Sequence, residues 1–170
     1  GKGTEGENTS KGDTEAKAPV ELNISAAASL KEVMADLETE YKKSNENVTL
    51  VVNYGSSGSL QQQIEQGAPC DLFISAGQKQ MNALKDEGLL VDDTTKDLVE
   101  NSLVLVAANG IDITSFDDLK SDKVTHIAVG EPESVPAGKY ADEVLTNTGI
   151  KDSITDKLVF AKDVKEVLSW

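Results

Sequence analysis

Small polar residues occupy three places where the chain is expected to pass from a strand into a helix. They are Ser29, the run GSSGS at 55–59 and the run VPAGKY at 135–140. The first N–H groups of a helix have no partner within the helix and carry partial positive charge. Helix starts that converge therefore predict an anion site that uses no cationic side chain. Each stretch alone fits an ordinary cap or turn, and Ser29 with Glu32 has the form of a capping box.

Hydrophobic periodicity predicts the elements that position these three stretches. Strands are expected at 22–26, 48–52, 72–74, 101–108, 124–129 and 158–160. Helices are expected from the turn at 28–29 to about residue 43, at 59–66, 78–87, 115–119 and 137–148, and from residue 163. Met34, Leu37 and Tyr41, with Val33 beside them, form the expected inward stripe of the first helix. Repeated strand-then-helix units predict an α/β fold whose ligands lie at the carboxyl ends of parallel strands.

A change of pattern near Val99 divides the folded part into two predicted lobes, at 21–99 and 100–170. Residues 1–20 are expected to form a disordered polar tether. Residues 1–19 hold no Val, Ile, Leu, Met or aromatic residue whose burial could offset the entropy of ordering. Such a tether fits a surface lipoprotein from which the signal and the anchor have been removed, and it also fits a terminus without any function.

Composition argues against several functional classes. The chain has 16 Lys, no Arg and 30 Asp plus Glu, and its net charge of -14 opposes nucleic-acid binding. A single Cys and a single His leave no internal disulfide and no His cluster for a metal. A serine hydrolase built on Ser57 would need a Gly-x-Ser-x-Gly turn, which residues 54–58 do not form. We therefore expect no enzyme, no cofactor and no metal site.

At the strand-to-helix junctions the sequence resembles the molybdate-binding protein family, the substrate-binding components of molybdate transporters. The matching stretches are 27–30, 55–58, 63–69, 71–76, 101–107, 128–132, 135–138 and 140–141. They follow one another in family order from Leu22 to Leu168. Cys70 stands where the family has a small residue, usually Ala, and is a conservative change.

The resemblance implies a type II periplasmic-binding-protein fold, with two Rossmann-like lobes and an oxyanion held in the cleft between them. Family ligands fall on Ser29 and Ser57, each giving its hydroxyl and its backbone N–H. Two further backbone N–H donors fall on Ala137 and Val164. The implied function is capture of molybdate, and of tungstate with it, outside the cytoplasm for an ABC-transporter permease, with a lipid anchor as the link to the membrane.

The resemblance also marks a departure from the family pattern. Family members continue beyond the helix that starts near residue 163 and supply a ligand Tyr, so this chain is expected to be truncated at its C-terminus. None of Tyr41, Tyr54 and Tyr140 occupies the position of that Tyr. An unfinished sheet edge would invite pairing with a second copy. The alternatives are a protein for tungstate or another oxyanion, and the effector-sensing lobe of a transcription regulator.

Overall fold

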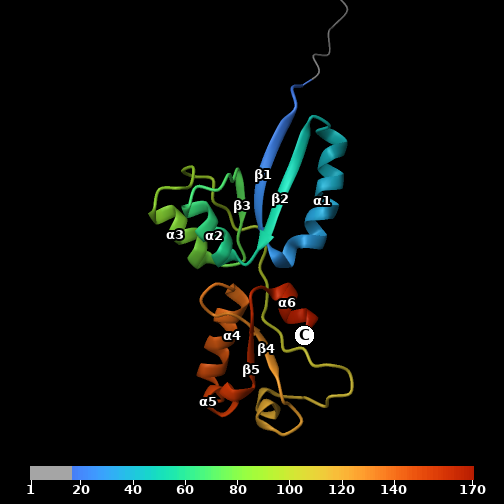
Figure 1. Ribbon diagram of the computed structural model, residues 1–170, viewed down its shortest axis with the longest axis vertical. Helices are drawn as coiled ribbons and strands as arrows, with labels where there is room; N and C mark the ends of the chain where they lie inside the picture. Colours follow the sequence, from blue (N-terminus) through green and yellow to red (C-terminus); the bar gives the residue numbers. More distant parts are fainter. Residues whose placement is uncertain (1–16) are drawn as a thin grey trace, which may run out of the picture.

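The computed structural model describes residues 17–170, which form two parallel sheets surrounded by helices (Figure 1). We call the part built on 20–86 the first lobe and the part built on 116–169 the second lobe. Most of the predicted tether, residues 1–16, lies outside the described residues. The predicted lobe boundary near Val99 falls within the long connection between the two sheets. Among the described residues, no helix has the length and apolar character that crossing a bilayer requires.

The first lobe is a sheet of three parallel strands in the order β2-β1-β3. The strands are β1 (Val20–Ala27), β2 (Val48–Gly55) and β3 (Leu72–Ile74). The helices are the 3-10 turn η1 (Ala28–Leu30), α1 (Lys31–Ser44), α2 (Ser57–Glu65) and α3 (Gln78–Asp86). Its core contains Ile24, Ala26 and Met34, and Leu60 and Leu84 are fully buried. Each helix follows a strand, as the sequence pattern predicts.

The second lobe pairs β4 (Ile127–Gly130) with β5 (Leu158–Ala161) in parallel. Its helices are the 3-10 turn η2 (Phe116–Lys120), α4 (Pro136–Asn147), α5 (Lys151–Ile154), the 3-10 turn η3 (Thr155–Lys157) and α6 (Val164–Ser169). Its core cluster consists of Leu119, Val124, Leu145, Ile150 and Ile154. The two lobes therefore have separate hydrophobic cores.

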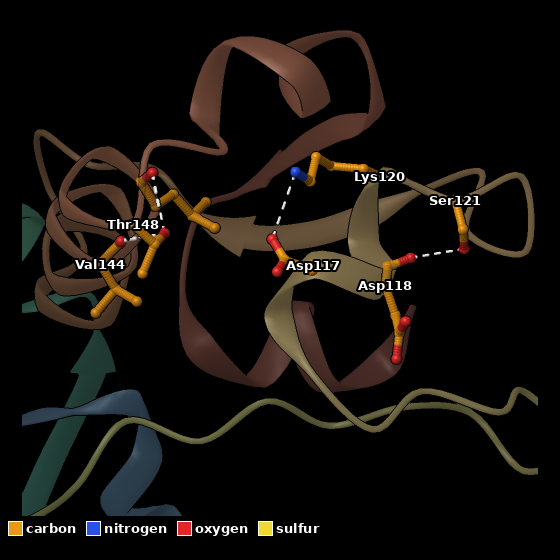
Figure 2. Close-up of polar contacts among 7 residues, drawn as sticks. Asp117, Asp118, Lys120, Ser121, Val144 and Thr148 are labelled. Atoms are coloured by element: carbon orange, nitrogen blue, oxygen red, sulfur yellow. Dashed lines mark hydrogen bonds and ion pairs between the residues drawn. The ribbon is translucent and has the colours of Figure 1, made fainter.

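Polar contacts hold the turn around η2 in place (Figure 2). Lys120 pairs with Asp117 at 3.4 Å, and the Ser121 hydroxyl donates to the Asp118 carbonyl at 2.7 Å. The Lys157 ammonium donates to the carbonyls of Leu119 and Ser121, at 2.9 Å each, and so joins this turn to the start of β5. Such bonds satisfy backbone carbonyls that the short helix leaves without partners.

The prediction of a strand at 101–108 is wrong. The structure gives this segment no regular secondary structure, and Leu103, Val104 and Val106 are 44%, 72% and 71% exposed. A strand needs a neighbour for its backbone N–H and C=O groups, and no described strand pairs with this segment. The apolar run of the sequence therefore stays in the long connection between α3 and η2.

The predicted inward stripe of the first helix is wrong in part. Met34 is buried, but Val33, Leu37 and Tyr41 are 50%, 54% and 40% exposed. Figure 1 shows α1 at one side of the first sheet, beside the edge strand β2. Only one side of the helix meets the sheet there, so a narrower apolar stripe is buried than the periodicity indicates.

Candidate functional site

The strand register of the first lobe places three turns at one edge of the sheet. Ala27 of β1 lies opposite Gly55 of β2, and Ala26 lies opposite Ile74 of β3. The three parallel strands therefore end side by side, and the turns that follow them carry Ser29, Ser57 and Ala76. In open α/β sheets, ligands bind at this carboxyl edge.

The second lobe repeats this arrangement with two strands. Gly130 of β4 lies opposite Ala161 of β5, and α4 and α6 begin shortly after these residues. Ala137 is the second residue of α4, and Val164 is the first residue of α6. Backbone N–H groups at these positions have no acceptor one turn earlier in their own helix.

Close packing fixes the start of α4 against the end of β4. A Cβ atom at Gly138 would lie 2.0 Å from the Gly130 carbonyl oxygen, and one at Gly130 would lie 2.5 Å from Cγ1 of Val135. Only glycine fits such a close backbone approach. The position of the Ala137 amide therefore depends on a rigid contact between helix and strand.

The carboxyl edges of the two lobes face each other (Figure 1). The Gly58 N–H donates to the Ser134 carbonyl across the lobes at 2.9 Å. The Lys165 ammonium forms an ion pair with the carboxylate of Glu32, 133 residues earlier in the chain. The hydrogen bond from Lys165 holds the pKa of Glu32 below its usual value. Hence the Ser57 turn lies beside the start of α4, and the Ser29 turn lies beside the start of α6.

Ser57 is nearly inaccessible and already has one hydrogen-bond partner. It is 1% exposed, and its Oγ accepts from the Ala76 N–H at 2.9 Å. A serine hydroxyl that accepts one bond still has its own proton to donate. The neighbouring Ser56 is the N-cap of α2, because its Oγ accepts from the Ser59 N–H at 3.2 Å.

The prediction that Ser29 and Glu32 form a capping box is wrong. Helical structure begins earlier, at Ala28, so Ser29 lies inside η1 and no side-chain cap bond is formed there. Ser29 is exposed, and the Glu32 carboxylate is turned toward Lys165. A hydroxyl that does not cap its own helix is free to face a ligand.

A cavity of about 580 Å³ also lies between the lobes. Its lining consists of Tyr54, Gly55, Ser56, Ser59, Glu131, Ser134, Phe160, Ala161, Lys162 and Asp163. None of the four predicted donor residues lines it, although Ser56 and Asp163 directly precede two of them. Burial raises the pKa of the Tyr54 hydroxyl, and the Glu38 carboxylate adds to the rise. The cavity is therefore a recess of mixed polar and apolar lining next to the donors, and the donors do not form its wall.

Sequence reasoning missed the cap of α6 and the contacts that bring the lobes together. Asp163 caps α6 by accepting from the Glu166 N–H at 2.9 Å, and the spacing of Asp163 and Glu166 is a cap signature that could have been read. The pairing of Glu32 with Lys165 and of Gly58 with Ser134 leaves no local signal in the sequence. These contacts join residues that only the fold makes neighbours.

The remaining reactive residues have local contacts. Cys70 is half-buried, and its Sγ lies 3.3 Å from the Leu72 carbonyl oxygen. His126 is exposed, and its Nδ1 lies 3.1 Å from the Thr125 hydroxyl. Within the part of the chain that the structure describes, no group of three or more His, Cys, Asp or Glu could hold a metal ion.

Two α/β lobes whose helix starts face one another define the class of periplasmic binding proteins. Residues 22–170 match the family described as bacterial extracellular solute-binding protein. The chain belongs to this family, which confirms the family resemblance seen in the sequence.

The chain is similar to molybdate-binding proteins and to a transporter lipoprotein. It is 37% identical to the molybdate-binding protein ModA of Haemophilus influenzae, over 89% of this chain and 62% of ModA. It is 42% identical to YvgL of Bacillus subtilis, a lipoprotein assigned to ABC-transporter substrate binding, over 96% of this chain and 63% of YvgL.

A solved structure adds to this similarity. It is a substrate-binding domain assigned to a molybdenum ABC transporter of Clostridium difficile. Sequence identity is 72% with a TM-score of 0.63, and the match covers 89% of this chain and 66% of that one. The chain thus spans somewhat less than two thirds of the length of the proteins it resembles.

Proposed function

We propose that this chain captures molybdate outside the cytoplasm and delivers it to an ABC-transporter permease. The observation that carries the proposal is the pairing of donor turns across the lobes. The Gly58–Ser134 hydrogen bond sits beside Ser57 and two residues before α4, and the Glu32–Lys165 pair sits beside Ser29 and Val164. The similarity to molybdate-binding proteins supports the same conclusion.

The proposed ligand groups are all uncharged hydrogen-bond donors. Ser29 and Ser57 would each give a hydroxyl and a backbone N–H, and Ala137 and Val164 would each give a backbone N–H. A chain of net charge -14 repels anions at long range, so the attraction must come from directed donors at short range. In a cleft that excludes water, each such bond is stronger than it would be in solvent.

The charge and size of the oxyanion would decide selectivity. Molybdate is a tetrahedral dianion at neutral pH, so all its oxygens accept hydrogen bonds and match a site made only of donors. Phosphate usually retains a proton at that pH, so its O–H would face one of the hydrogen-bond donors of the site. Sulfate is smaller and would leave long hydrogen bonds in a rigid site. Tungstate is nearly isosteric with molybdate, so we propose it as a second ligand.

The cellular setting follows from the family, whose members are described as extracellular. We propose a lipid anchor for this chain, as in the YvgL lipoprotein, with the polar segment before β1 as a spacer. The partner would be a permease that accepts the loaded, closed form.

Calorimetric titration of the 170-residue chain tests the proposal. Molybdate and tungstate are expected to bind with similar affinity, and sulfate at the same concentration is expected to give at least a hundredfold weaker binding, about 2.7 kcal/mol. Equal binding of sulfate and molybdate would contradict the proposed selectivity. No heat from either oxyanion, with circular dichroism showing a folded chain, would contradict oxyanion capture by these residues.

A further inference from the structure

Gly58 lies where the backbone of the first lobe contacts the backbone of the second. It is the second residue of α2, and its N–H donates to the Ser134 carbonyl at 2.9 Å. A Cβ atom at position 58 would lie 2.6 Å from the Ser134 carbonyl oxygen and 2.7 Å from its Cα. These are backbone atoms of the other lobe, which cannot turn aside as the end of a flexible side chain can.

A second glycine of the first lobe meets the same segment of the second lobe. A Cβ atom at Gly77 would lie 2.9 Å from Cγ and 3.2 Å from Cβ of Pro136, besides 2.3 Å from Oε1 of Gln80 in its own lobe. Gly58 and Gly77 together face Ser134 and Pro136, and we call these four residues the glycine seam. At one end of the seam the backbone of Gly58 packs against the backbone of Ser134. At the other end the backbone of Gly77 packs against the ring of Pro136.

The local conformation of Gly58 gives no other reason for a glycine. Gly58 is helical, and it is not among the glycines with positive φ. Alanine is a better helix former than glycine, so a helix alone would favour alanine here. The need for glycine at this position therefore comes from Ser134 across the seam.

The seam lies directly beside two of the proposed donors. Ser57 precedes Gly58, and Ala137 follows Pro136 in the chain. We propose that the glycine seam sets the separation between the Ser57 hydroxyl and the Ala137 amide, and that Gly58 is thereby a positioning residue for the oxyanion. This inference rests on the proposed function. N–H···O hydrogen bonds form at about 2.7–3.2 Å, so moving the lobes apart by about 1 Å would take donors out of reach of a ligand that both lobes hold.

Hydrogen exchange by NMR on the ligand-free chain tests the seam without any oxyanion. In Gly58→Ala we expect the amide at position 58 to exchange at least tenfold faster, after correction for intrinsic rates, because its acceptor in the second lobe moves away. The Leu60 amide, which donates to the Ser56 carbonyl within α2, is the internal reporter of folding and keeps its protection. In Gly55→Ala the atoms nearest to the added methyl belong to Ser59 and Leu60 of the same lobe, so we expect the exchange of Gly58 to stay as in wild type.

Molybdate titration of the same variants then tests positioning. Gly58→Ala is expected to bind at least tenfold more weakly than wild type. Gln62→Ala, an exposed change that also favours the helix, is expected to bind as wild type does. Unchanged exchange at position 58 overturns the seam, whatever happens to binding. Faster exchange with unchanged affinity overturns the positioning role.

The proposed function can fail separately from the seam. If wild type binds neither molybdate nor tungstate while Gly58→Ala still exchanges faster at position 58, oxyanion capture is rejected and the glycine seam stands as the contact that joins the lobes.

Discussion

Ser29 and Ser57 bear the same hydroxyl in different surroundings. Ser29 is exposed in a 3-10 turn, whereas Ser57 is buried and accepts the Ala76 N–H. If the proposed site is right, substitution of either serine removes a hydrogen bond to a charged ligand, worth about 1.5–3 kcal/mol. A second loss is specific to Ser57, because its removal leaves the Ala76 amide without its acceptor.

Both alanine variants are therefore expected to weaken molybdate binding by at least tenfold, but only one should lose stability. Ser57→Ala is expected to lower the melting temperature of the ligand-free chain, because an intramolecular hydrogen bond contributes about 0.5–1.5 kcal/mol. Ser29→Ala is expected to leave the melting temperature unchanged. Calorimetric titration and thermal unfolding measure the two effects.

Ser44→Ala, an exposed change at the end of α1, is the control for both measurements. A loss of affinity below twofold for both Ser29→Ala and Ser57→Ala would remove them from the ligand set. Equal melting temperatures for the two variants would contradict the structural role given to the Ser57 hydroxyl.

Among the elements, η2 contains a carboxylate that accepts several hydrogen bonds. Asp118 accepts from the N–H groups of Thr114 and Ser115, at 2.8 and 3.1 Å, and these backbone hydrogen bonds lower its pKa. A pKa that is lower in the folded chain means that the carboxylate stabilises the fold above its ordinary pKa of 3.8. That contribution is lost as the pH falls through the lower, folded-state value.

Asp118→Asn is accordingly expected to lower the melting temperature at pH 7. Between pH 5 and about pH 2, the melting temperature of this variant should fall less steeply than that of wild type. Asp122→Asn, in the exposed turn next to η2, is the matched control and should behave as wild type. Thermal unfolding followed by circular dichroism over this pH range measures the difference. Parallel pH curves for wild type and Asp118→Asn would contradict the role of Asp118 as a charged cap.

The sequence predicted the elements that are determined by residues close to one another in the chain. The strand at 72–74 is observed at the same residues, and those at 22–26 and 158–160 are observed with longer ends. The strand expected at 124–129 begins only at Ile127, and the short helix α5 was missed. The prediction for the apolar segment 101–108 was wrong because a strand needs a neighbouring strand to pair with. Hydrophobic periodicity does not show whether such a neighbour exists.

The candidate site could also be predicted from the sequence only in part. The turns of Ser29, Ser57 and Ala137 could be placed from strand-to-helix patterns, and Val164 came from the resemblance alone. The glycine seam and the Glu32–Lys165 pair could not be predicted, because they join lobes that are distant in the sequence. In the sequence Gly58 looks like an ordinary turn glycine, and only the fold shows that it packs against Ser134.

On the scale of the whole molecule, the two lobes have separate hydrophobic cores. The core of the first lobe contains Ile24 and Met34, and that of the second contains Ile150 and Ile154. The ion pair between Glu32 and Lys165 has side chains 76% and 35% exposed, and exposed pairs of this kind contribute little to stability. The ion pair therefore adds little to the contact that Gly58 and Ser134 make between the lobes.

Damage to one core is consequently expected to stay within its lobe. Ile154 is 0% exposed, so Ile154→Ala should cost about 2–5 kcal/mol through lost burial and the cavity that remains. Hydrogen exchange by mass spectrometry should show faster exchange in peptides from 124–161 and unchanged exchange in peptides from 20–84. The milder Ile154→Val should cost about 0.5–1.5 kcal/mol of stability and give the same pattern of exchange with smaller changes in rate. An equal loss of protection in both sets of peptides would mean that the lobes unfold as one unit, and the separate cores would then not make the lobes independent.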